Sequence, residues 1–317
     1  MKHLIIKIAL LLFTMISISY PQTVSKTGTT AAQFLKIGVG ARALAMGGAY
    51  AATSNDATAL YWNPAGLSSL KKNEILLDHQ DWILDVDLDF VGASFKTPYG
   101  TIGAAICAMY MGEMEVTTTH NPEGTGESFN AGSLMGQISF SRMLTDRFSF
   151  GISSKIIREN IYNSKATGFA IDLGTLYVTQ IQGLTMGMSI SNYGTRMKYD
   201  GIDLLNPIDI APYEDGNFAD VPGQFRPQGW ELPLLFRIGI GIKPVYTDLH
   251  RLILAIDAVH PNNNSEFVNV GAQYELRMAG QGSLYLWSGF KTLFISDFAY
   301  GLTFGGGLKK NFINKQV

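Results

Sequence analysis

Carboxylate and histidine side chains gather near residue 80, where their types and spacing raise the question of metal binding. Asp81, Asp85, Asp87 and Asp89 alternate with other residues, and oxygen ligands in such a pattern can bind calcium or bridge cations on lipopolysaccharide. A calcium loop also needs a central glycine and a terminal glutamate, which this segment lacks. His79 and the other histidines have no zinc-ligand spacing. We therefore expect a solvated acidic rim and no bound metal.

Nucleophilic catalysis finds little support in the chain. A serine hydrolase needs a serine, a histidine and a carboxyl or amide partner together, and the sequence has no Gly-x-Ser-x-Gly block. The single cysteine, Cys107, excludes an internal disulfide and a cysteine-based zinc site, and its alanine neighbours Ala105 and Ala108 indicate a packing role. We expect no enzymatic activity and no cofactor.

Charged residues of both signs recur at alternate positions within apolar segments. They are Lys155, Asp172, Arg237, Arg251, Asp257 and Glu275. If these segments are strands with one apolar face, all six point to the other face, where opposite charges can pair. A ladder of paired charges lining a lumen is the simplest interpretation. A proton or ion path, or a polar spot that binds a ligand, is the alternative.

The elements that would position these side chains are strands, because apolarity alternates with period two from residue 73 onward. In residues 232–243, apolar side chains such as Phe236 and Ile238 alternate with Arg237 and Gly239. Such segments of about ten residues are typical of transmembrane β-barrels. Twelve strands are expected, at residues 73–82, 86–97, 101–116, 131–143, 147–160, 166–180, 183–193, 231–243, 250–260, 266–278, 283–291 and 297–309. The predicted barrel covers residues 73–312.

The composition agrees with a wall that faces lipid. Charged residues make up 16% of the 317 residues, against about 25% in soluble proteins. The 34 glycines and the apolar content exclude a coiled coil and a disordered chain. The net charge of −2 provides no basic surface for nucleic acid. A soluble β-sandwich with one polar face remains the rival fold.

Connections between the expected strands alternate between short and long, which gives the barrel an orientation. Bacterial barrels have short periplasmic turns and longer outer loops, so both termini are expected on the periplasmic side. The connection 194–230 contains four prolines. It is either a long surface loop or a loop that hides one further hairpin, which would raise the strand count from twelve to fourteen.

The N-terminus reads as an export signal. Lys2 and Lys7 precede an apolar run, Ile8–Ile18, which has the length of a signal-peptide core and is short of a membrane span. We place cleavage after Ser19, so that residues 1–19 are removed and the destination lies beyond the inner membrane. An uncleaved N-terminal membrane anchor is the alternative.

Residues 20–72 do not alternate and are expected to form a compact plug or cap. Phe34, Ile37, Ala41 and Leu44 have helical spacing, and many small residues would let the backbone pack tightly inside a lumen. The Asn63-Pro64 step has two interpretations. It is a helix stop and turn that anchors the plug, or part of a gate.

Four short blocks follow one another in this segment: Gly-Ala-Arg at 40–42, Gly-Gly-Ala-Tyr at 47–50, Asp-Ala at 56–57 and Trp-Asn-Pro-Ala-Gly at 62–66. They closely resemble the opening of the PorV/PorQ outer-membrane family, which is similar to the FadL transporters of hydrophobic compounds. The residues that carry the resemblance are Gly40, Arg42, Gly47, Gly48, Tyr50, Asp56, Trp62, Asn63, Pro64, Ala65 and Gly66. The resemblance covers some thirty residues, and the rest of the chain agrees by pattern.

The resemblance implies a FadL-like barrel of fourteen strands in the bacterial outer membrane, surrounded by outer-membrane lipid. It also implies work in type IX secretion, in which a PorV-like barrel receives cargo by its C-terminal signal domain and carries it between the translocon subunits and the attachment machinery. The alternative is a FadL-like transporter of hydrophobic molecules such as fatty acids. An apolar cavity lined by Met109, Met111, Phe140 or Trp287 is expected in that case, although strand parity makes several of these side chains face lipid.

Overall fold

A computed structural model describes residues 28–181, 183–210, 213, 221–278, 282–293 and 301–310. The predicted signal peptide and its cleavage site at Ser19 lie outside these residues. So does the first part of the predicted plug.

Short helices form the N-terminal segment. They are η1 (Gln33–Lys36), α2 (Ala41–Ala45), α3 (Ala59–Trp62) and η2 (Pro64–Ser69). Pro64 occupies the start of η2, where the missing N–H costs nothing, and the Asn63 side chain caps that helix by accepting from Ala65 N. No helix in the described part of the chain is long and apolar enough to cross a membrane.

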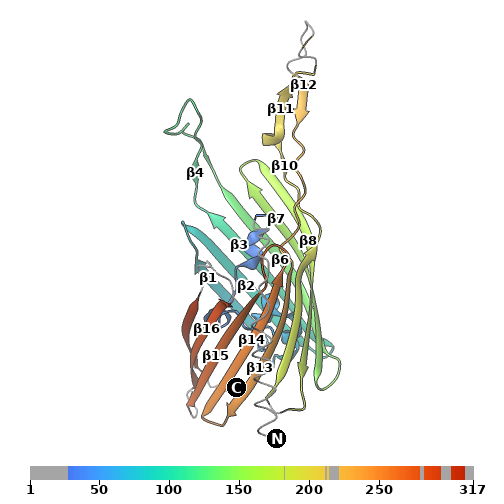
Figure 1. The fold of residues 1–317 in the computed structure, drawn as a ribbon, viewed down its shortest axis with the longest axis vertical. Coiled ribbons are helices and arrows are strands. Elements are labelled where there is room, and N and C mark those ends of the chain that lie inside the picture. The colour runs from blue at the N-terminus through green and yellow to red at the C-terminus, as the bar shows by residue number, and fades with distance from the viewer. Residues whose placement is uncertain are drawn as a thin grey trace, which may run out of the picture.

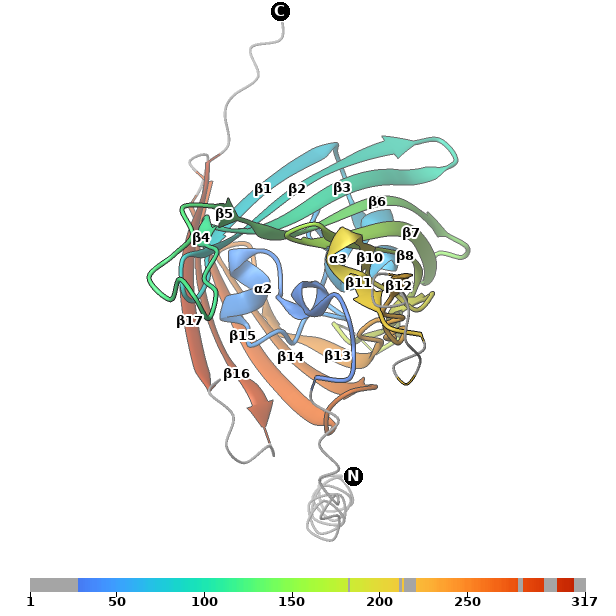
Figure 2. The same ribbon diagram turned by 90° about the horizontal axis from the view of Figure 1, so that it is seen from above.

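Twelve antiparallel strands form the wall. They are β1 (Glu74–Asp81), β2 (Val86–Thr97), β3 (Gly100–Met111), β6 (Ala131–Met143), β7 (Phe148–Ile161), β8 (Ser164–Val178), β9 (Thr185–Gly194), β13 (Leu235–Tyr246), β14 (His250–Pro261), β15 (Phe267–Met278), β16 (Gly282–Leu293) and β17 (Leu302–Lys310). Each pairs with the next in this order, and the sheet curls around the helices (Figure 2). Within the described residues no ladder joins β1 to β17, the two edge strands. Every predicted strand has its counterpart.

Alternate side chains point to opposite faces of this wall. In β13, Arg237 is buried while Ile238 is 39% exposed, and their partners across β14, Val259 and Ala258, follow the same rule. Exposed large apolar side chains recur along the outer face, as lipid contact requires. The low charge content of the chain is thus a property of this outer face.

Two hairpins lie outside the wall. One joins β4 (Met114–Glu115) to β5 (Ser128–Phe129), so the strand predicted at 101–116 ends earlier, at Met111. The other joins β11 (Leu205–Ile208) to β12 (Val221–Gln224). Of the two alternatives for 194–230, the further hairpin is present, but it pairs apart from the wall, so the described wall has twelve strands and not the fourteen that the family resemblance implies. Pro207 and Pro222 face each other in this hairpin, and proline lacks the N–H that a strand within a sheet must donate.

The two ends of the barrel differ. The turns β2–β3, β6–β7 and β13–β14 lie at the short-turn end, near which the wall begins and ends (Figure 1). The opposite, long-loop end carries the β4–β5 hairpin and, rising above it, an arm formed by β10 (Asp200–Gly201), η3 (Ile202–Leu204), β11 and β12. Since short turns of bacterial barrels face the periplasm, we expect the arm to point to the cell exterior.

The helical segment fills the lumen as a plug. Its buried residues Tyr50, Leu60, Trp62 and Leu67 belong to one hydrophobic core with inward wall residues such as Phe90. Glycines on the inner wall face make room for it. A Cβ on Gly151, Gly174, Gly187, Gly271 or Gly289 would collide with plug atoms. The glycine excess of the sequence thus permits close contact between plug and wall.

Candidate functional site

Arg42 in α2 is the centre of a polar network that joins the plug to the wall. Its Nη1 donates to Asn55 Oδ1 at 2.7 Å and to Asp56 Oδ2 at 3.0 Å, and its Nε donates to Gln273 Oε1 of β15 at 2.6 Å. The guanidinium also lies over the Tyr50 ring, 5.1 Å from its centroid. Three of the residues with family resemblance, Arg42, Tyr50 and Asp56, are therefore in direct contact.

Asp56 is the anion of this network. It accepts from Arg42, from the Tyr50 hydroxyl at 2.8 Å, and from both the backbone N–H and the hydroxyl of Thr58. Burial acts to raise the pKa of Asp56, but Arg42 and the hydrogen bonds from Thr58 and Tyr50 outweigh it and hold that pKa below its ordinary value of 3.8. Burial in turn raises the pKa of the Tyr50 hydroxyl. The site therefore holds a partly exposed carboxylate beside a buried, neutral phenol.

Asp257 of β14 clamps the plug backbone. Its Oδ2 accepts from the backbone N–H groups of Tyr50 and Ala51, each at 2.8 Å. Gly47 and Gly48, just before, have positive φ of 65° and 77°, the conformation that favours glycine. Asp257 is buried on the inner face of the wall, and its hydrogen-bond partners are backbone groups of the plug and not an opposite charge.

Asn63 ties the end of α3 to the wall. Its Nδ2 donates to Ala51 O at 2.7 Å and to Thr175 O of β8 at 3.1 Å, while its Oδ1 accepts from Ala65 N. Trp62 Nε1 donates to Val39 O at 2.8 Å. A Cβ on Gly66 would collide with the backbone of Ser54. The contacts of the Trp-Asn-Pro-Ala-Gly block therefore anchor the plug to the wall.

The inward charges are only partly paired. Lys155 Nζ lies 2.6 Å from Asp172 Oδ2, with side-chain exposures of 3% and 0%, and it also donates to Asn192 Oδ1 at 2.8 Å. Glu275 accepts from Ser283 and Tyr285 and lies 3.8 Å from Arg251 and 3.9 Å from Arg277. Among the inward wall charges that the structure describes, only Lys155 and Asp172 form the short ion pair that a ladder of paired charges predicts.

Arg237 has aromatic partners instead. Its guanidinium lies over Tyr61 and Trp62 of the plug, 5.9 and 5.4 Å from the ring centroids, and Nη1 donates to Ser191 at 3.3 Å. Within the described chain, no carboxylate lies within ion-pair distance of it. Cation–π contacts of this kind compensate part of the cost of burying a guanidinium.

A cavity of about 810 Å³ lies between the plug and the long-loop end. Plug residues Phe34, Ile37 and Trp62 form one wall of it, and Met109 and Leu235 form part of the other. Its polar lining includes Arg237, Lys291, Asn263 and Asn269. This size fits a small-molecule ligand.

The expectation about this cavity is right for Met109 and Met111, which line it. It is wrong for Phe140, which is 40% exposed on the outer wall face. It is also wrong for Trp287, whose side chain packs against the core and donates to Gln273. Phe140 has outward parity in β6, so the alternation of residues in the sequence already indicates that its side chain faces away from the cavity.

Sequence reasoning missed several polar residues that hold the plug. Asp78 accepts from Gly40 N at 3.0 Å, and Gln137 Nε2 donates to Leu60 O at 2.7 Å. Tyr61 donates its hydroxyl to Leu35 O. Asp78 and Gln137 have inward parity in β1 and β6, and this signal would have identified them.

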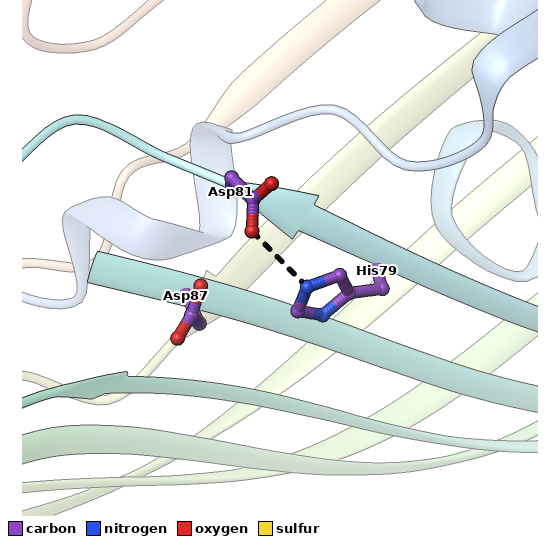
Figure 3. A group of neighbouring side chains, drawn as sticks. All are labelled: His79, Asp81 and Asp87. Atoms are coloured by element: carbon purple, nitrogen blue, oxygen red, sulfur yellow. Dashed lines mark hydrogen bonds and ion pairs between the residues drawn. The ribbon is translucent and has the colours of Figure 1, made fainter. Parts of the chain in front are cut away.

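The acidic rim gathers around His79 at the outer end of the β1–β2 hairpin. The ladder pairs His79 with Asp89 and Asp81 with Asp87, and ligand atoms of His79, Asp81 and Asp87 lie within 4.8 Å of one another (Figure 3). His79 contacts Asp89 at 2.7 Å and Asp81 at 3.2 Å. All these side chains are at least partly exposed, as a solvated rim requires. Asp85 lies in the turn.

Comparison with known proteins identifies the family. The model of the family described as "Type IX secretion system protein PorV" matches residues 20–211, more than half of the chain. Comparison with curated protein sequences finds no significant match.

Solved structures agree on the fold. The toluene transporter TodX of Pseudomonas putida shares 15% identity at a TM-score of 0.53, and the alignment covers 85% of this chain and 88% of TodX. The monoaromatic hydrocarbon channel CymD shares 11% identity at a TM-score of 0.51, covering 87% of this chain and 89% of CymD. The chain therefore belongs to the PorV family of type IX secretion proteins and is a transmembrane β-barrel of the outer membrane.

Proposed function

We propose that the protein is an interaction component of type IX secretion, which receives exported cargo by its C-terminal signal domain and passes it from the translocon to the attachment machinery. The observation that carries this proposal is the arm at the long-loop end. Its exposed apolar side chains include Ile202, Leu205 and Phe225, at 65%, 58% and 60% exposure. Apolar side chains exposed together mark surfaces that bind partners.

The arm is firmly rooted, so it presents these side chains in a defined place. β10 pairs with β8, and Asp203 accepts from the backbone and side chain of Asn163. Gln224 donates to Asp200 at 2.8 Å. At the base, Met197 is fully buried and pairs with Trp230. A rooted arm loses less conformational entropy on binding than a free loop.

Replacing Leu205 and Phe225 together by serine tests the proposal. We expect the double variant to reach the outer membrane in normal amount but to deliver less type IX cargo to the cell surface. The matched control is Leu144→Ser, because Leu144 is 59% exposed but lies in the β6–β7 turn at the opposite end. Normal cargo delivery by the double variant, or an equal defect in the control, contradicts the proposal.

The plugged cavity supports a second function, FadL-like transport of a hydrophobic small molecule. Its largely apolar lining and the buried Arg237 would suit an apolar molecule with a polar end. TodX is a toluene transporter, and CymD is a monoaromatic hydrocarbon channel. Under this proposal, cells that lack the protein take up such a compound more slowly, and Met109→Arg, which narrows the cavity, reproduces the defect.

A further inference from the structure

A second cavity, of about 620 Å³, opens at the short-turn end of the barrel. Cationic side chains from separate elements meet in its lining: Lys71 before β1, Arg251 of β14, Arg277 of β15 and Lys309 of β17. The carboxylates in the lining are Asp248 and Glu275. Four positive and two negative groups leave an excess of two positive charges. Such convergence from distant parts of the sequence creates a local field that attracts anions.

Glu275 does not saturate the two arginines. Its Oε1 accepts from the hydroxyls of Ser283 and Tyr285 at 2.9 and 3.0 Å. Arg251 Nη1 and Arg277 Nε lie 3.8 and 3.9 Å from its oxygens, which is beyond hydrogen-bond distance. Both guanidinium groups therefore keep donors for another acceptor.

Arg251 is held ready for such an acceptor. Its guanidinium lies over the Tyr246 ring, 4.2 Å from the centroid, which fixes its plane. Its Nε is buried and, among the described residues, has no hydrogen-bond partner. A buried donor left without an acceptor costs free energy, so the hydrogen bonds of the Arg251 side chain are not all satisfied within the described part of the protein.

We propose that this cavity binds a phosphate group. A phosphate offers several oxygens in different directions and can accept from cations that surround it, whereas a carboxylate offers only two in one plane. The group belongs either to the headgroup of an anionic phospholipid of the periplasmic leaflet or to a free phosphorylated small molecule. This site lies at the opposite end of the barrel from the arm and from the plugged cavity, and it does not depend on the function proposed for either.

Titration of the purified full-length protein in detergent with inorganic phosphate tests the site. We expect saturable binding that Arg251→Gln weakens at least about tenfold, the factor that corresponds to one lost charge-assisted hydrogen bond. Arg147→Gln is the matched control, because Arg147 is an exposed arginine in the β6–β7 turn at the same end of the barrel. Lys309→Gln is a second test that leaves the Arg251–Glu275 contact in place, and it should weaken binding too.

A competition experiment between inorganic phosphate and a phospholipid identifies the source of the phosphate group. If phosphatidylglycerol displaces inorganic phosphate, and native mass spectrometry shows its retention by the wild type and not by Arg251→Gln, the source is lipid. If phosphate binds and the lipid does not compete, the source is a free phosphorylated molecule. Unsaturable binding, or equal loss in Arg251→Gln and Arg147→Gln while both variants keep heat-modifiable gel migration, overturns the proposal.

Discussion

Single polar side chains hold the plug in the lumen, and Asn63 shows how. Its amide donates to two carbonyls, one in the plug and one in the wall, and its oxygen caps η2. An aspartate has the same shape but has no donor, and its negative charge would face those two carbonyls. The side-chain amide is therefore required, and an asparagine before a proline is more than a helix stop here.

Asn63→Asp is expected to destabilise the protein by about 3 kcal/mol, because two buried carbonyls lose their donor and a buried charge takes its place. Chemical unfolding followed by tryptophan fluorescence measures this loss, since Trp62 is buried next to the site. Asn121→Asp, in an exposed loop, serves as the control. Equal stability of the two variants would show that the anchor is unimportant.

Asp56 makes the stability of the folded protein depend on pH. Its pKa is held below 3.8 by Arg42, Thr58 and Tyr50 despite burial. A carboxyl whose pKa is lower in the folded state stabilises that state above its unfolded pKa, and the stabilisation disappears as pH falls through the folded pKa. We expect the melting temperature of the wild type to fall more steeply than that of Asp56→Asn below about pH 4. Parallel pH profiles would contradict this.

Lys155 and Asp172 form a buried ion pair in the lumen. Lys155→Met leaves Asp172 buried without its cation, and we expect a loss of about 3 to 5 kcal/mol. Arg196→Met breaks the pair between Arg196 and Glu231, whose side chains are 66% and 57% exposed, and should have a far smaller effect because solvent screens that pair. Denaturant unfolding of both variants measures the difference. Similar losses of unfolding free energy in the two variants would mean that burial does not determine how much these ion pairs stabilise the protein.

At the level of elements, each wall strand has an outer face for lipid and an inner face shaped to the plug. Gly174 in β8 faces Asn63 and Pro64, and a Cβ there would collide with Asn63 Oδ1. Gly136 in β6 has outward parity, and its Cβ would lie 3.4 Å from Ile156 Cγ2, an ordinary contact. The same residue type thus has different roles on the two faces.

Gly174→Ala is expected to cost about 1 to 3 kcal/mol, because overpacking displaces the plug anchor. Gly136→Ala should be neutral or slightly stabilising, since alanine loses less backbone entropy on folding. The shift of the unfolding midpoint measures both. A stabilising effect of Gly174→Ala would show that the plug does not touch the wall at this point.

Period-two alternation was sufficient to locate all twelve wall strands, because lipid on one side and plug on the other impose opposite demands on neighbouring residues. It could not show that the hairpin in 194–230 leaves the wall, since a hairpin pairs internally wherever it lies. Nor could it show that Asp257 accepts from plug backbone. Strand parity specifies which face of the wall a side chain occupies. Its hydrogen-bond partner depends on the path that the plug backbone takes through the lumen.

The whole molecule is a plugged barrel with two different ends. The long-loop end carries the arm (Figure 1). The larger cavity lies between the plug and that end, and the cationic cavity opens at the short-turn end. Family membership connects this architecture with type IX secretion. Arg42, Asn63 and Asp257 fasten the plug to the wall. The proposed function therefore requires partners to bind the arm and does not require the plug to move.

The proposed role in type IX secretion can be tested by purifying the native protein from outer membranes in mild detergent and identifying everything that co-purifies by mass spectrometry. We expect to find a type IX translocon subunit or cargo that carries the C-terminal signal domain. Stoichiometric fatty acid or hydrocarbon without any such protein would contradict it and favour transport of a hydrophobic molecule.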